Sequence, residues 1–215
     1  MSTDAPLDPR AALETISEQQ DALRRRTLIR SSPLLAAWGL AWLIGYGAGW
    51  LSIRPDYSMP TPVWVIYFVC LAAAGAYTCA YIVRRARGVR GVSNRAGVRY
   101  GTAWAGGFVL GLVVMGRTGA FLASLGTSEA AEAGMILGNA VPCLIIGTLF
   151  VACSAVWDEP VMAWVGGWLL AVTTVATLVG GTGLWAIMAL AGGGGTLIAA
   201  AIDVLRARAA RRAAR

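Results

Sequence analysis

Residues 34–52 read LLAAWGLAWLIGYGAGWLS, nineteen residues with no charge, three tryptophans and four glycines. As an α-helix rising about 1.5 Å per residue, this stretch is long enough to cross roughly 30 Å of hydrocarbon. Five further stretches share its apolar character. The sequence therefore predicts an all-α polytopic membrane protein with six transmembrane helices arranged as three helical hairpins.

Three parts follow from this assignment. We expect an amphipathic cytoplasmic helix at 1–32, a transmembrane domain at 33–205 and a basic cytoplasmic tail at 206–215. A long loop is predicted at 117–133, between the third and fourth spans. The six spans are predicted at about 34–52, 62–83, 100–116, 134–157, 161–179 and 184–205.

The first thirty residues have the signals of a helix start. Asp8 is a capping carboxylate, and Pro9 presets the backbone where no amide donor is needed. Acidic residues come early in this segment and arginines come late, which complements the helix dipole. The segment either lies along the inner membrane surface or against a partner, or it is a solvated tail.

The charge of the chain is carried almost entirely outside the spans. All 18 basic residues are arginine, the net charge is +7, and 57% of the residues are hydrophobic. In so apolar a chain, arginine clusters beside the spans favour anionic lipid headgroups over nucleic acid. The predicted headgroup contacts are Arg24, Arg25, Arg26, Arg84, Arg85 and Arg87.

The arginines also predict the orientation. If the N-terminus is cytoplasmic, sixteen arginines lie on the inner side, and Arg54 and Arg117 lie on the outer side. The positive-inside rule then places both termini in the cytoplasm. The use of arginine to the exclusion of lysine fits a GC-rich bacterial codon bias, so we expect a bacterial plasma membrane.

An eight-residue pattern recurs at the start of the first, third and fifth spans. It reads WGLAWLIG from Trp38, WAGGFVLG from Trp104 and WVGGWLLA from Trp164. In each copy two small residues four apart form a flat strip on which a neighbouring helix can pack closely. The predicted packing residues are Ala41 and Gly45, Gly107 and Gly111, and Gly167 and Ala171.

The repeat has two interpretations. Three hairpins in parallel orientation around a pseudo-threefold axis would explain it. Alternatively, tryptophans near the membrane boundary form an aromatic belt, and glycine and alanine are merely abundant.

The opening from Trp38 to Gly45, behind a short segment ending in Arg24, Arg25 and Arg26, resembles a group of small, uncharacterised six-span bacterial membrane proteins. The resemblance covers about the first fifty residues. It implies a six-span fold, and it implies no activity and no catalytic residues.

The chain offers few groups for chemistry. Without histidine or lysine it lacks Ser-His and Cys-His nucleophiles and histidine-based metal sites. Cys70, Cys79, Cys143 and Cys153 have no metal-ligand spacing, which predicts small buried hydrophobes. We therefore expect no catalytic residue, no metal and no cofactor, and not an enzyme.

Two interruptions inside the predicted spans are the candidate substrate site. In the fourth span Asn139 precedes Pro142, which has no amide hydrogen to donate to the Gly138 carbonyl. In the sixth span four consecutive glycines expose the backbone near mid-depth: Gly192, Gly193, Gly194 and Gly195. Broken spans can mark a transporter's substrate site. The simpler alternative is a proline kink and a close helix crossing.

Two functions remain for comparison. The first is a non-enzymatic membrane protein that acts through partners, as an accessory, sensor or assembly subunit. The second is a permease-like subunit served by a separate ATPase that docks on residues 84–99. That segment has no clear coupling-helix pattern, and no span contains an ionisable residue near the midplane.

Overall fold

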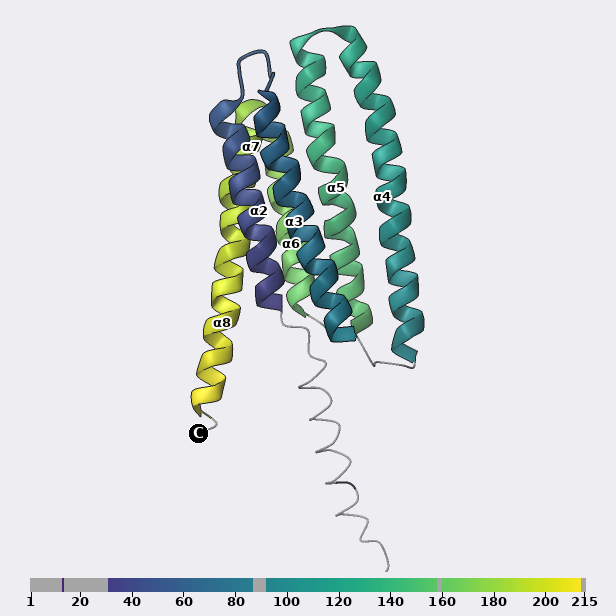
Figure 1. The fold of residues 1–215 in the computed structure, drawn as a ribbon, viewed down its shortest axis with the longest axis vertical. Helices are drawn as coiled ribbons and strands as arrows, with labels where there is room; N and C mark the ends of the chain where they lie inside the picture. Colours follow the sequence, from purple (N-terminus) through teal and green to yellow (C-terminus); the bar gives the residue numbers. More distant parts are fainter. Residues whose placement is uncertain (1–12, 14–30, 87–91, 158–159, 214–215) are drawn as a thin grey trace, which may run out of the picture.

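The computed structural model describes residues 13, 31–86, 92–157 and 160–213 (Figure 1). These residues contain six helical segments long and apolar enough to cross a membrane, and no strand. The predicted all-α polytopic fold is therefore confirmed. The helices are α2 (Ser31–Ser52), α3 (Thr61–Ala86), α4 (Val92–Leu125), α5 (Ser128–Trp157), α6 (Pro160–Val179), and a last span built from α7 (Gly181–Ile187), the π-helix η1 (Met188–Gly194) and α8 (Gly195–Ala213).

The loop predicted at 117–133 is wrong. Helix α4 continues to Leu125, and α5 begins at Ser128. Gly126 ends α4 with a φ of 66°, and the Thr127 hydroxyl accepts a hydrogen bond from the Ala130 amide at 3.2 Å. A glycine after the last turn and a threonine N-cap are the usual ends of two helices. The hydropathy pattern predicts that the third span ends at 116 and the fourth begins at 134, because charged residues lie between them. Both helices extend beyond their apolar segments into this region.

The structure describes most of the C-terminal segment but little of the N-terminal one. The predicted amphipathic helix falls on 1–12 and 14–30, outside the described residues. At the other end, residues 206–213 continue α8 as helix. The basic segment expected as a tail is therefore mostly the last two turns of the final span.

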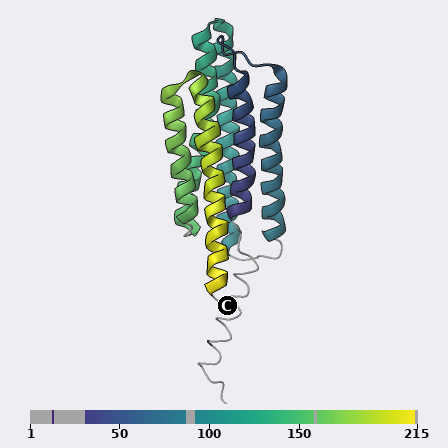
Figure 2. The same cartoon turned by 90° about the vertical axis from the view of Figure 1, so that its left-hand side faces the viewer.

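The spans form three antiparallel hairpins: α2 with α3, α4 with α5, and α6 with the last span (Figures 1 and 2). The returning helix of the second hairpin, α5, packs on α6. The last span packs on α2 and so joins the third hairpin to the first. Among the described residues, α3 and α4 share no extensive packing contact. The predicted threefold arrangement thus has two of its three junctions.

Aromatic and aliphatic side chains fill the space between α2, α6 and the last span. Leu184, Met188 and Ala176 are almost completely buried. The same cluster contains Trp42, Tyr46, Cys143, Leu169, Val172, Trp185 and Ala189. Because both α3 and α4 lie at the ends of the row of packed helices, their outward faces carry the largest share of exposed apolar side chains, which suits contact with lipid.

The first two copies of the repeated pattern use their small residues within hairpins. A Cβ on Gly45 would lie 3.1 Å from the ring of Tyr67 on α3. On α4, a Cβ on Gly111 would lie 2.8 Å from Ile145 of α5, and one on Gly107 would lie 3.2 Å from the same side chain. Ala41 is buried. These positions leave room for the returning helix of their own hairpin.

The third copy packs differently. Gly167 has no atom within 4 Å of its Cβ position, and Ala171 is exposed. The preceding residue, Gly166, makes the close contact instead, with its Cβ position 2.7 Å from the carbonyl oxygen of Gly147 on α5. The small residues that pack in this helix are therefore one position out of register with the aligned pattern.

Candidate functional site

Polar side chains follow one face of α5 through the half of the bundle that carries the α2–α3 loop. Glu132, Asn139 and Cys143 are spaced by seven and four residues, which places them on one side of a helix. This side faces the turn before α7, the side chain of Tyr46 on α2, and α6. The fold therefore aligns a polar stripe with the centre of the bundle.

Asn139 is at the centre of a buried hydrogen-bond network. The Tyr46 hydroxyl donates to Asn139 Oδ1 at 2.6 Å, and the Tyr67 hydroxyl donates to the Tyr46 hydroxyl at 3.1 Å. The Cys143 thiol lies 3.9 Å from Asn139 Oδ1. Three spans, α2, α3 and α5, thus share one polar network in the buried interior of the bundle, where the low dielectric strengthens these bonds.

Three buried polar atoms near this network lack a full complement of hydrogen bonds. Asn139 is 5% exposed and Trp185 is 4% exposed, yet Asn139 Nδ2 and Trp185 Nε1 have no partner in the part of the chain that the structure describes. The Thr173 hydroxyl, on a residue that is 7% exposed, has no partner apart from the weakly accepting thiol of Cys143 beside it. The network therefore has unused donors, and a water molecule or a small polar solute could accept hydrogen bonds from them.

The residues of the predicted intramembrane site are not brought together. Asn139 joins the tyrosine network, and Pro142 lies one turn further along α5 without ending the helix. Gly192 faces Trp42, Met188 and Val172.

The glycine run serves packing. Gly193 lies against the backbone of α2, and its Cβ position is 2.5 Å from the Leu43 amide nitrogen. Gly195 lies against the indole of Trp168, and Gly194 has no atom within 4 Å of its Cβ position. Local widening of the helix into η1 accompanies this close approach.

Sequence reasoning missed Tyr46 and Tyr67. Tyrosine in a transmembrane helix is usual near the headgroups, where its hydroxyl reaches water. Tyr46 instead lies two turns from the end of α2 at Ser52 and is 4% exposed. A tyrosine set back from both ends of an apolar span was the available signal for a buried polar partner.

Glu132 fixes the end of the stripe that lies nearest the α2–α3 loop. Its Oε1 accepts a hydrogen bond from the Gly181 amide at 2.7 Å, and its carboxylate also bonds the Tyr57 hydroxyl. Gly180 and Gly181 have φ of 63° and 52°, and a Cβ on Gly180 would lie 2.6 Å from Glu132 Oε1. Only glycine leaves the carboxylate this space in a left-handed turn.

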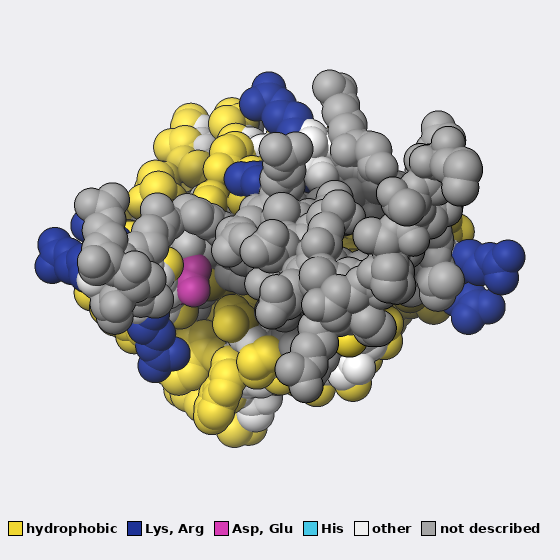
Figure 3. Space-filling model, turned by 90° about the horizontal axis from the view of Figure 1, so that it is seen from below, with side chains coloured by type: hydrophobic (Ala, Val, Ile, Leu, Met, Phe, Trp, Pro, Cys, Tyr) yellow, Lys and Arg dark blue, Asp and Glu magenta, His cyan; other side chains and the backbone are white. Residues whose placement is uncertain are grey.

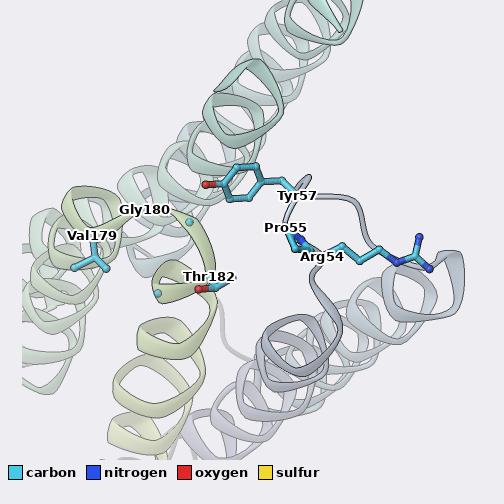
Figure 4. A pocket seen from close by; sticks show the side chains of 8 residues that line it. Arg54, Pro55, Tyr57, Val179, Gly180 and Thr182 are labelled. Carbon is cyan, nitrogen blue, oxygen red and sulfur yellow. The ribbon is translucent and has the colours of Figure 1, made fainter. Parts of the chain in front are cut away.

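The loop between α2 and α3 completes this end of the molecule. Asp56 Oδ1 accepts bonds from the Ser58 amide at 3.1 Å and the Ser58 hydroxyl at 2.8 Å, and these bonds lower the pKa of Asp56. Tyr57 adopts a φ of 60°, which is unusual for an aromatic residue, and its hydroxyl points toward the Gly180 turn (Figure 4).

A pocket of about 440 Å³ opens between this loop and the turn. The guanidinium of Arg54 points away from it (Figure 4). Its lining residues are Arg54, Pro55, Tyr57, Val179, Gly180, Gly181, Thr182 and Gly183.

Replacing Glu132 with glutamine will lower the pKa of Tyr57. The hydrogen bond to Glu132 is the largest cause of the raised pKa of this phenol, followed by desolvation and the negative charges of Glu132 and Glu129. Because the folded pKa is above its ordinary value, this contact favours the folded loop at neutral pH. The preference is lost as the pH rises through the raised pKa.

Absorbance titration of the phenolate measures this effect, with Tyr57→Phe subtracted to isolate one tyrosine. A titration curve unchanged by Glu132→Gln would show that the carboxylate does not control the phenol. Glu129→Gln is the matched control, since its charge contributes least to the shift.

The opposite end of the molecule is basic. Ser32 donates a hydrogen bond to Asp203 at 2.5 Å and so joins the start of α2 to α8. Figure 3 shows arginine side chains at the rim of this end. Those described are Arg84, Arg85, Arg95, Arg99, Arg206, Arg208 and Arg212. The predicted headgroup contacts Arg84 and Arg85 are in the last turn of α3, whereas Arg24, Arg25, Arg26 and Arg87 lie outside the described residues.

Neither a metal-ligand cluster among the described residues nor a similar known protein indicates a function for this chain. No three His, Cys, Asp or Glu side chains gather as metal ligands within 31–86, 92–157 and 160–213. The resemblance of the first fifty residues to six-span bacterial proteins stays a prediction. Comparisons with protein families, with curated proteins and with solved structures give no match for this chain.

Proposed function

We propose that this chain is a non-enzymatic integral membrane protein that acts through a partner, as an accessory or assembly subunit of a bacterial plasma membrane. One observation carries the proposal: most glycines of α4 have no close neighbour among the described residues. Gly107 and Gly111 contact α5. The other five have no atom within 4 Å of their Cβ positions: Gly97, Gly101, Gly106, Gly116 and Gly119.

Unused glycines in a lipid-facing helix favour a protein neighbour. A glycine inside a helix costs roughly 0.5–1 kcal/mol relative to alanine. It also offers acyl chains no side chain to contact, whereas it lets another helix approach closely. Only 6% of the residues in the α4 span are buried, against 39% in the α2 span. Helix α4 therefore has both the surface and the composition of a helix that packs on a partner.

A photoreactive residue placed on α4 tests the proposal in native membranes. We expect the reagent at Val113, which is 57% exposed, to cross-link to protein. The matched control is Val175 of α6, which is 51% exposed and should yield only lipid adducts. Lipid adducts alone at Val113 would contradict the proposal.

The orientation belongs to the same proposal. Of the arginines whose side chains are described, seven lie at the end where α8 finishes, and Arg54 and Arg117 lie toward the other end. The positive-inside rule supports cytoplasmic termini and contacts of Arg84 and Arg85 with anionic headgroups. A reporter fused after residue 215 should be active only if it folds in the cytoplasm, and activity specific to the outer side would reverse the assignment.

A second function, a permease-like subunit, is supported by the unused amide of Asn139. A buried donor without a partner in a Pro-containing span is suited to hold a polar solute. In liposomes carrying the protein with any ATPase recovered from native membranes, Asn139→Leu should abolish solute flux. Flux no greater than that of empty liposomes, with no ATPase recovered, would remove this function.

A further inference from the structure

The two junctions between hairpins are built in the same way. Where α5 crosses α6, the Cβ position of Gly147 lies 3.2 Å from the Gly166 carbonyl oxygen and 2.6 Å from Leu170. Where η1 crosses α2, the Cβ position of Gly193 lies 3.0 Å from the Gly39 carbonyl oxygen and 2.5 Å from Leu43. In both, a glycine of the returning helix meets a glycine, and the leucine four residues after it, on the outgoing helix of the next hairpin.

The contacts are reciprocal. The Cβ position of Gly166 lies 2.7 Å from the Gly147 carbonyl oxygen and 3.0 Å from Val151. That of Gly39 lies 3.1 Å from the Gly193 carbonyl oxygen and 2.8 Å from Leu197. Each crossing thus pairs one glycine from each helix at backbone distance, and the residue four positions after each glycine also makes contact. Leu170, Val151 and Leu197 do so through their side chains, and Leu43 does so through its backbone.

The third junction would join α3 to α4, and its residues are present but unpaired. Residues 104–110 of α4 read WAGGFVL, and residues 164–170 of α6 read WVGGWLL. Gly106 therefore corresponds to Gly166, and Leu110 to Leu170. Gly106 has no atom within 4 Å of its Cβ position, and Leu110 is 65% exposed.

Helix α3 supplies the other half. Its only glycine, Gly75, also has no atom within 4 Å of its Cβ position. Gly75 stands three residues before Thr78, which accepts a bond from the Trp38 indole at 3.0 Å. Gly147 stands three residues before Phe150, whose ring contacts Trp104. Gly75 thus occupies in the first hairpin the position that Gly147 occupies in the second.

We propose that a second copy of this chain provides the missing neighbour, with Gly75 of α3 in one copy crossing Gly106 of α4 in the other. The two surfaces match because the chain already forms the same crossing twice, and both halves of the third are open in every copy. Copies inserted in one orientation keep α3 and α4 antiparallel, as α5 and α6 are. This inference rests on the proposed function and names its partner.

A cysteine at position 106 tests this contact. Val151, four residues after Gly147, lies 3.0 Å from the Cβ position of Gly166. In the proposed crossing the corresponding residue is Cys79, an exposed native cysteine four residues after Gly75. The thiols of Cys79 in one copy and of the G106C variant in the other should therefore be adjacent. Within its own copy Gly106 has room for a side chain, so the variant should fold. At the crossing its Cβ would lie close to the Gly75 backbone, as that of Gly166 does to Gly147, so the disulfide would join helices that have moved slightly apart.

Copper-phenanthroline and oxygen, as the oxidant, should convert G106C into a disulfide-linked dimer in native membranes. Adding C79S should abolish the dimer. The control G167C, at an open position of α6, should stay monomeric.

Two outcomes overturn the inference. A disulfide within one chain would mean that α3 and α4 close on each other. If G106C forms no disulfide and the unsubstituted chain is also monomeric in native lipid, by counting photobleaching steps, this crossing does not form. If the unsubstituted chain is monomeric while the photoreactive residue at Val113 captures another protein, the proposed function stands and only the identity of the partner is wrong.

Discussion

Replacing Gly193 with alanine will destabilise the bundle by about 1–3 kcal/mol, and leucine at this position will separate the last span from α2. The Cβ position of Gly193 lies 2.5 Å from the Leu43 amide nitrogen and 2.8 Å from Leu43 Cα. These are backbone atoms of another helix, so no rotamer change can make room. The two helices must move apart, and this contact lies beside the buried core.

The neighbouring glycine is the matched control. Gly194 belongs to the same π-helix but has no atom within 4 Å of its Cβ position. Alanine there should be neutral or stabilising by up to roughly 0.5–1 kcal/mol, because it restricts the unfolded backbone. SDS titration of both variants in mixed micelles, followed by helical circular dichroism, measures the difference. Equal effects at the two positions would contradict the crossing geometry.

The crossing of α5 with α6 allows a rescue that the crossing of η1 with α2 does not. A Cβ on Gly147 meets the Leu170 side chain at 2.6 Å, and a side chain can be shortened. Leu170→Ala should therefore recover part of the stability lost in Gly147→Ala. Leu43→Ala should recover none of the loss in Gly193→Ala, since the obstructing atoms belong to the main chain.

Much of the architecture could be predicted from composition alone. Six apolar stretches must become helices in lipid, because only helices satisfy every backbone group within one segment. Helix ends could not be predicted this way. The charges of Arg117 and Glu129 end the apolar segments of the sequence. The helices nevertheless include both residues: α4 continues until Gly126 stops it, and α5 begins after the Thr127 cap. Hydropathy predicts which residues contact lipid, whereas capping residues predict where a helix begins and ends.

The packing was harder to predict because it depends on which neighbour each face meets. The small residues of the repeat pack as expected in α2 and α4, whereas in α6 the contact moves by one residue to Gly166. A one-residue shift turns a helix face by about 100°, which an eight-residue pattern cannot resolve. The same limit applies to Asn139, whose partner Tyr46 is 93 residues away in sequence.

Replacing Tyr46 with phenylalanine will destabilise the protein by about 0.5–2 kcal/mol, and adding Asn139→Leu will recover most of this loss. Tyr46→Phe removes the 2.6 Å bond to Asn139 Oδ1. Asn139 Nδ2 already lacks a partner among the described residues, so the buried amide would then keep only the weak contact of the Cys143 thiol with Oδ1 at 3.9 Å. Removing that amide as well leaves an apolar contact, apart from the hydroxyl of Tyr67.

The double-mutant cycle separates this network from general packing. If the tyrosine and the amide act as a pair, their effects on the free energy of unfolding are non-additive by about 0.5–2 kcal/mol. Additive losses would show that the Tyr46 hydroxyl stabilises the protein independently of the Asn139 amide, through its bond with the Tyr67 hydroxyl. Tyr67→Phe is the control, because its longer 3.1 Å bond ends on the Tyr46 hydroxyl and leaves Asn139 Oδ1 paired. If Tyr67→Phe lowered the free energy of unfolding as much as Tyr46→Phe, the critical bond would be the one between the two tyrosines and not the one to Asn139.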